Sequence, residues 1–186
     1  MKKIILLILL IIGCQKNQES NINIDESEFW HIKYFVNQFN ELTDVGYITN
    51  INPIFGTYKN LKRDDARKLK VKMMIKERAV GIKLYENESD QSVKGAKQNP
   101  IEYEMTMKHN DQIIDFIFKA INETDVVVIG NVISSTHQNK LINYLKLGGK
   151  FEFILKTISG INKKEYKFEI NDNSKSGFID NFENLK

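Results

Sequence analysis

The 186-residue chain has one cysteine, Cys14, and only two prolines and ten glycines. A lone cysteine excludes an internal disulfide, a cysteine-based metal site and thiol catalysis in the folded part. So little proline and glycine excludes collagen-like and low-complexity classes. Hydrophobic residues make up 41% of the chain, which is enough to bury one core of ordinary size. The composition therefore favours a globular protein over a disordered one.

An excess of charge of one sign is also lacking. The chain carries 27 basic and 24 acidic side chains, for a net charge of +3. Lys2 and Lys3 belong to a leader that we expect to be removed, and without them the balance is 25 to 24, or +1. Such a balance gives no reason to expect a nucleic-acid partner.

The N-terminus has the pattern of a secretory signal. Met1-Lys2-Lys3 is basic, and the nine residues 4–12 are all Ile or Leu. A membrane-spanning helix needs about 20 apolar residues, so this run is too short to cross a bilayer. We predict a cleaved signal peptide over residues 1–13.

Ile11-Ile12-Gly13-Cys14 resembles the bacterial lipobox. The resemblance implies that the Cys14 sulfur carries a diacylglyceryl group and that the chain is cut before it, after which the new amine takes a third acyl chain such as palmitate. Two or more acyl chains anchor a protein stably, at about 0.8 kcal/mol per buried CH₂. We therefore expect Cys14 to be the lipid attachment site, followed by a flexible polar tether over residues 14–28. The alternative is an ordinary signal peptide with an incidental cysteine.

The remaining residues, 29–186, are expected to form one β-rich domain. Apolar and polar residues alternate over 30–36, 69–76, 80–85 and 103–107, and in a last pair of segments over 151–155 and 166–170, which predicts strands with one buried face. Thr43 to Gly46 has turn composition. Residues 112–121 fit a strand or a helix, and their β-branched and aromatic content favours the strand. Helices are predicted around Leu141 to Leu145, stopped by Gly148, and around 178–185. About nine strands and two short helices without a βαβ rhythm predict an antiparallel sandwich-like fold.

The sequence has no recognisable catalytic or metal-binding pattern, with one exception. His31, His109 and His137 are scattered, and no nucleophile elbow, zincin or P-loop pattern is present, so we predict no enzyme activity, no cofactor and no metal. The exception is 172–183, where oxygen-bearing residues and a glycine follow EF-hand spacing. The segment before it alternates like a strand, so a strand, a turn and a helix N-terminus are the competing interpretation.

A lysine-rich stripe is the candidate ligand site. Residues 59–83 carry ten basic and three acidic side chains. The stripe could bind a sulfated glycan, an anionic lipid headgroup or an acidic host protein; alternatively it is a solvated sheet face or edge protection. Residues 86–125 are acidic and could neutralise it. The candidate residues are Lys68, Lys70, Lys72, Lys76 and Lys83.

The leader, the tether and the richness in Ile, Lys and Asn are similar to small outer-surface lipoproteins of Lyme and relapsing-fever spirochaetes. Short marks such as Gly46-Tyr47-Ile48 and Gly56-Thr57-Tyr58 also resemble a recurring bacterial envelope domain. The resemblance implies an anchor at Cys14 and no catalytic residues. We expect an outer-membrane, surface-exposed lipoprotein that acts as a binding or antigenic module with possible host ligands. The alternative is a periplasm-facing lipoprotein that assists envelope assembly or inhibits an envelope enzyme.

Overall fold

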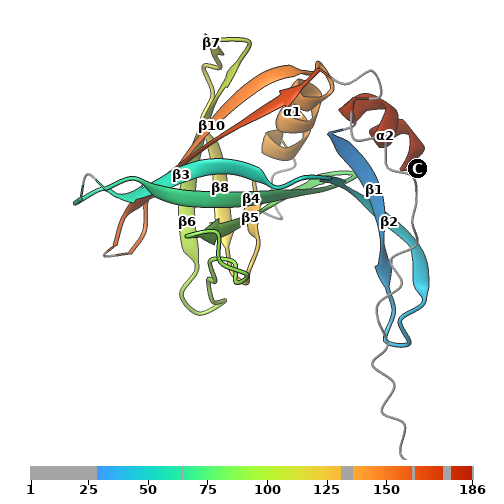
Figure 1. Ribbon diagram of the computed structural model, residues 1–186, viewed down its shortest axis with the longest axis horizontal. Helices are drawn as coiled ribbons and strands as arrows, with labels where there is room; N and C mark the ends of the chain where they lie inside the picture. The colour runs from blue at the N-terminus through green and yellow to red at the C-terminus, as the bar shows by residue number, and fades with distance from the viewer. Residues whose placement is uncertain (1–28, 64, 131–135, 161, 174–176, 186) are drawn as a thin grey trace, which may run out of the picture.

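The structure is a computed structural model, and it describes residues 29–63, 65–130, 136–160, 162–173 and 177–185. The predicted signal peptide, Cys14 and the tether lie outside the described residues. Figure 1 shows a closed set of strands with two helices and one long hairpin that leaves the strands at one end of the molecule.

The main feature is a closed antiparallel barrel of eight strands. Around the barrel, each strand is paired with the next in the order β3, β4, β5, β9, β8, β6, β10, β11 and back to β3. Short β7 extends β6, and the β1–β2 hairpin joins the barrel through β4. The strands are β1 (Trp30–Val36), β2 (Leu42–Asn50), β3 (Ile54–Asn60), β4 (Arg67–Lys76), β5 (Ala79–Glu86), β6 (Ile101–His109), β7 (Gln112–Ile113), β8 (Phe118–Asn122), β9 (Val127–Ile129), β10 (Gly149–Thr157) and β11 (Lys164–Asp172).

Apolar side chains fill the barrel. Because side chains alternate along a strand, each barrel strand sends every second residue inward. On β4, for example, Leu69, Val71, Met73 and Ile75 are all fully buried. Fully buried aromatic rings from β6, β8, β10 and β11 complete the same core. The interior of the barrel is thus a packed core, and binding must use its outer surface.

The predicted sandwich is wrong, although the mainly β composition and the two short helices are confirmed. The sheet closes because β3 pairs with β11 and β4 pairs with β5. At Gly56 the backbones of β3 and β11 approach so closely that an added Cβ would lie 2.1 Å from the Lys167 carbonyl oxygen. Strands this distant in sequence leave no local signal of their pairing. Alternation predicts which face is buried, and it does not distinguish one closed sheet from two stacked ones.

Two local predictions are corrected by turn chemistry. Residues 43–46, expected as a turn, lie inside β2. The real turn is at 37–41, where the Asn37 side-chain oxygen accepts hydrogen bonds from the backbone N–H groups of Phe39 and Glu41. The segment 112–121 is strand only at its ends, in β7 and β8. The described residues form eleven strands, and the division of this segment into β7 and β8 adds one to the expected number.

The two helices close the structure. Helix α1 (Thr136–Leu145) buries Leu141, Ile142 and Leu145, as the sequence predicts. Helix α2 (Phe178–Asn184) packs Phe178 against the Trp30 indole, with ring centroids 5.4 Å apart. Buried Asp172 holds this corner together, because its carboxylate accepts hydrogen bonds from Trp30 Nε1 and from the backbone N–H of Phe178, both at 3.0 Å. The last barrel strand, the closing helix and the base of the hairpin therefore meet at one carboxylate.

Candidate basic cleft and apolar arm

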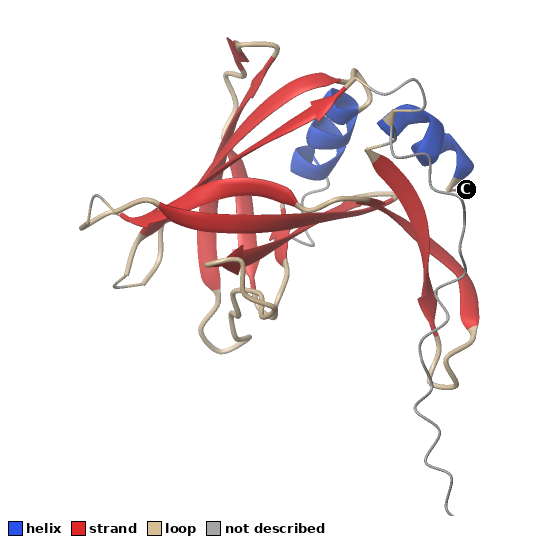
Figure 2. Ribbon diagram, in the orientation of Figure 1, coloured by secondary structure: helices blue, strands red, loops and turns tan. Residues whose placement is uncertain are grey.

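The β1–β2 hairpin, called the arm from here on, projects beyond the barrel. Figure 2 shows its turn as the part of these strands most distant from the barrel. At its base, Trp30 is buried in the core and Ile32 packs against it. Beyond Lys33 the exposed side chains become mainly apolar. The arm therefore has a fixed base and an exposed apolar end.

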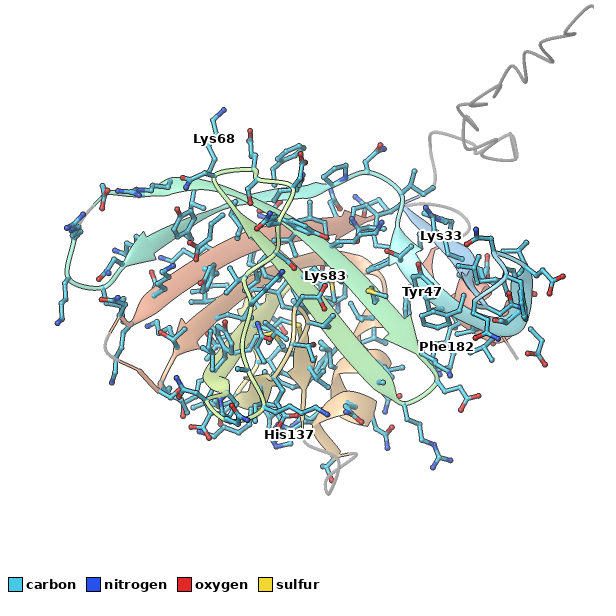
Figure 3. The ribbon with its side chains drawn as sticks, turned by 90° about the horizontal axis from the view of Figure 1, so that it is seen from below. Lys33, Tyr47, Lys68, Lys83, His137 and Phe182 are labelled. Atoms are coloured by element: carbon cyan, nitrogen blue, oxygen red, sulfur yellow. The ribbon has the colours of Figure 1, made fainter. Side chains whose placement is uncertain are left out.

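The lysine stripe lies on the outer face of the barrel. Lys68, Lys70 and Lys72 alternate with the buried residues of β4, so all three point outward, as the sequence predicts. Lys76 lies at the exposed end of the same strand. Lys83 is directly opposite Lys72 on β5. Figure 3 shows Lys68 and Lys83 over this part of the barrel, with Lys33 to one side on the arm.

Acidic residues from the 86–125 region neutralise much of the stripe. Lys68 pairs with Glu88 and Lys70 with Asp90, each at 3.8 Å. The Lys83 ammonium donates to the Asp125 carboxylate at 2.7 Å, and this hydrogen bond lowers the pKa of Asp125. These pairs agree with the alternative that the acidic residues of 86–125 neutralise the lysine stripe. They are partly exposed, and such pairs contribute little to stability, about 0–1 kcal/mol each.

Lys72 differs from its neighbours. No described carboxylate lies within ion-pair distance of its ammonium. Its pKa is lowered, first by partial burial and then by repulsion from Lys33 and Lys83. A half-buried cation among other cations has an unfavourable electrostatic energy. An anion placed beside it would relieve both the repulsion and the missing hydrogen bond.

A cleft of about 310 Å³ opens beside Lys72. Lys70 and Lys72 contribute cations to it, and the Tyr85 ring, 5.0 Å from the Lys70 ammonium, forms an apolar wall. The volume suits one sugar unit or a sulfate or phosphate group with its first substituents. The remaining lining residues are Asn50, Ile51, Pro53, Val71 and Asp90.

The three histidines do not converge on one site. His109 stacks on the Phe151 ring at 4.7 Å, and its Nε2 lies 2.8 Å from the Gly148 carbonyl oxygen. His137 lies on α1 at the edge of the molecule in Figure 3, and its Nδ1 accepts the backbone N–H of Lys119 at 2.9 Å. Both contacts are structural. Within the described residues, no three His, Cys, Asp or Glu side chains gather in a way that could hold a metal ion.

A second cleft of about 310 Å³ lies beside His137 and is lined mainly by apolar side chains and backbone. Glu102 is its one carboxylate, and neighbouring Glu104, the other acidic residue of that strand face, pairs with Lys119. The paired carboxylates that general acid–base chemistry uses are therefore not brought together in this cleft.

The EF-hand-like segment starts at the end of β11 and finishes in α2, as the strand-to-helix interpretation expects, but the residue at the helix N-cap is Gly177, not the Asp172 or Ser174 expected from the sequence. Asp172, at the first loop position, is buried and accepts hydrogen bonds from protein donors. Asp180 and Glu183, at the ninth and twelfth positions, are already part of α2. Residues 174–176 lie outside the described residues.

Sequence reasoning misses Lys33 and the arm. Lys33 lies on the face of the arm that continues the outer face of β4, opposite Tyr47 in the β1–β2 register. Its effect on Lys72 depends on the β2–β4 pairing, and the 38 residues between the two lysines carry no sign of that pairing. The hairpin of the arm does leave a signal in the sequence, because apolar residues lie on both sides of a turn at 37–40 that contains two asparagines.

No family model, curated protein or solved structure matches the chain. Among the described residues, no helix is long and apolar enough to cross a membrane.

Proposed function

We propose that this protein is a lipid-anchored outer-membrane lipoprotein, exposed at the cell surface, that acts as a non-catalytic binding module for an anionic ligand. The supporting pattern for the anchor is the leader that ends in Ile11-Ile12-Gly13-Cys14. The observation that carries the binding role is Lys72, a partly buried ammonium that lies among other lysines without a carboxylate partner in the described chain.

The ligand class that fits this cleft is a sulfated glycan. Sulfate groups accept charge-assisted hydrogen bonds from ammonium groups, and the Tyr85 ring offers a flat surface for a sugar. Lys33, Lys72 and Lys76 carry no ion pair to a described residue, so they can meet sulfates without first breaking one. Lys70 and Lys83 would have to share their charge with Asp90 and Asp125. The free lysines therefore dominate the affinity.

Binding of size-defined heparin fragments tests this role. Lys72→Gln should weaken binding about tenfold or more, because one charge-assisted hydrogen bond is lost. The control is Lys97→Gln, which removes an exposed lysine that does not line the cleft. Equal affinities of the two variants would refute the cleft as the ligand site.

Salt dependence gives an independent measurement. If three lysines release counterions on binding, a rise from 50 to 200 mM salt should weaken binding roughly 20- to 40-fold. Lys72→Gln should reduce the slope by about one charge. A ligand held by the aromatic wall alone would show almost no slope.

The anchor and the location have their own test. Cells fed an alkyne-tagged palmitate should label the wild-type protein and not Cys14→Ser. External protease on intact cells should remove the wild-type protein. Labelling with full protease protection would support the periplasm-facing alternative, and absence of labelling would refute the anchor.

A further inference from the structure

The exposed apolar side chains are concentrated at the end of the arm. Six of the thirteen exposed large hydrophobic residues of the described chain fall within residues 34–45, which we call the tip. Phe39 and Leu42 are 72% and 73% exposed. A cluster of this kind marks an interaction surface, whereas single exposed apolar residues need no explanation. The six are Tyr34, Phe35, Val36, Phe39, Leu42 and Val45.

Several polar groups of the tip pair with one another. The Asn37 side-chain oxygen accepts two backbone N–H groups, and its amide nitrogen donates to the Glu41 carboxylate at 2.9 Å. Backbone bonds also join Asn37 to Glu41 and Asn40 to Asn37. The Thr43 hydroxyl donates to the Phe35 carbonyl oxygen at 3.0 Å. Each polar group paired within the turn lowers the cost of taking the turn out of water.

The apolar side chains point in more than one direction. Tyr34, Phe35 and Val36 are consecutive in β1, and consecutive residues of a strand project to opposite faces. A flat protein surface would cover one face and leave the other in water. The boundary between lipid headgroups and acyl chains surrounds an inserted tip on all sides.

The chain brings the tip to a bilayer. Trp30 lies sixteen positions after Cys14, and a chain of that length spans at most about 55 Å when extended. The β1 strand itself is about 20 Å long. The anchor therefore holds the tip within reach of the lipids in which its own acyl chains lie.

We infer that the tip of the arm inserts into the interfacial region of the bilayer that anchors the chain. This inference rests on the proposed anchor at Cys14. Glu41 and Asp44 are the charged residues within the tip, and they would remain at headgroup level. Since the tip carries no positive charge, insertion depends on apolar burial and takes place in zwitterionic lipid. The lysine cleft thereby stays free for its anionic ligand.

Site-specific fluorescence on the lipidated full chain tests the inference. Acylated Cys14 offers no thiol, so Gln38→Cys in the tip becomes the one labelling site for an environment-sensitive dye. Leu147→Cys is the matched control, because Leu147 is a 67% exposed residue of the barrel region. Both proteins are reconstituted in phosphatidylcholine vesicles that contain acyl-chain-brominated lipid. We expect a blue shift and quenching at position 38 and neither at position 147.

A tip variant and a lipid assay separate the outcomes. Phe39→Asn with Leu42→Asn, added to Gln38→Cys, should abolish the quenching while the far-ultraviolet circular dichroism stays unchanged. Mass spectrometry first verifies acylation, so a chain without acyl groups refutes the proposed anchor. An acylated chain whose tip dye remains in water overturns the insertion. Equal quenching at both positions also overturns the insertion, because it indicates a barrel that lies on the membrane. A blue shift that appears in detergent without vesicles, and only at high protein concentration, overturns it too, because it indicates that a second copy covers the tip.

Discussion

Replacing Asp172 should loosen the corner where β11, α2 and the arm meet. Asp172 is 5% exposed, and its carboxylate accepts from Trp30 Nε1 and the Phe178 backbone N–H. Asp172→Ala leaves two buried donors without this acceptor. Each such donor costs about 1–3 kcal/mol, so the free energy of unfolding should fall by about 2–6 kcal/mol.

Urea unfolding followed by fluorescence measures this loss directly, because Trp30 is the only tryptophan of the chain. Asp172→Asn keeps an oxygen acceptor of the same shape and loses the charge, so about 1–2 kcal/mol is expected. The control is Asp180→Ala, which removes an exposed carboxylate from α2 at the same corner. If Asp172→Ala and Asp180→Ala unfold at the same urea concentration, the carboxylate does not hold the corner.

Three further outcomes are expected. Gly56→Ala should lower the free energy of unfolding by more than about 3 kcal/mol, because the added Cβ would lie 2.1 Å from a backbone oxygen. Gly160→Ala is the control: its Cβ would meet open space, and its φ of +84° should cost about 1–2 kcal/mol. Thermal unfolding of the two variants measures the difference. Burial raises the pKa of Tyr103 to about 12. The neutral phenol therefore contributes about 2–3 kcal/mol of stability below pH 10, and this contribution should be lost as the pH rises from 10 to 12. The free energy of unfolding of Tyr103→Phe should fall less over the same range. Lys72→Met should raise the free energy of unfolding at neutral pH by a few tenths of a kcal/mol, because it removes a repelled cation, while Lys83→Met, which loses an ion pair, should not.

The local elements follow from the sequence because their signals are local. The alternation of Leu69, Val71, Met73 and Ile75 with polar residues predicts both the strand and its buried face. The turn at Asn110, where φ is positive, is equally visible in its residue types. Short-range chemistry is therefore sufficient for most strands and for both helices.

The barrel and the cleft depend on contacts that the sequence does not display. Closure needs β3 beside β11, and it needs glycine at position 56 for the close approach. The pKa of Lys72 is lowered first by burial, and then by repulsion from Lys33 of the arm and Lys83 of β5, which the sequence does not place beside it. A strand pattern specifies which side chains point outward, and only the register between strands specifies which of them become neighbours. The lysine stripe was thus predictable as a surface, and the distinct position of Lys72 within it was not.

The packed interior of the barrel has an evolutionary consequence. Alternate residues of β4 point into the core, and the residues between them point into solvent. Codons for the outward positions can change without disturbing the packing of the core. Related chains should accordingly diversify faster at outward barrel positions away from the lysine cleft than at the inward positions, which remain aliphatic or aromatic.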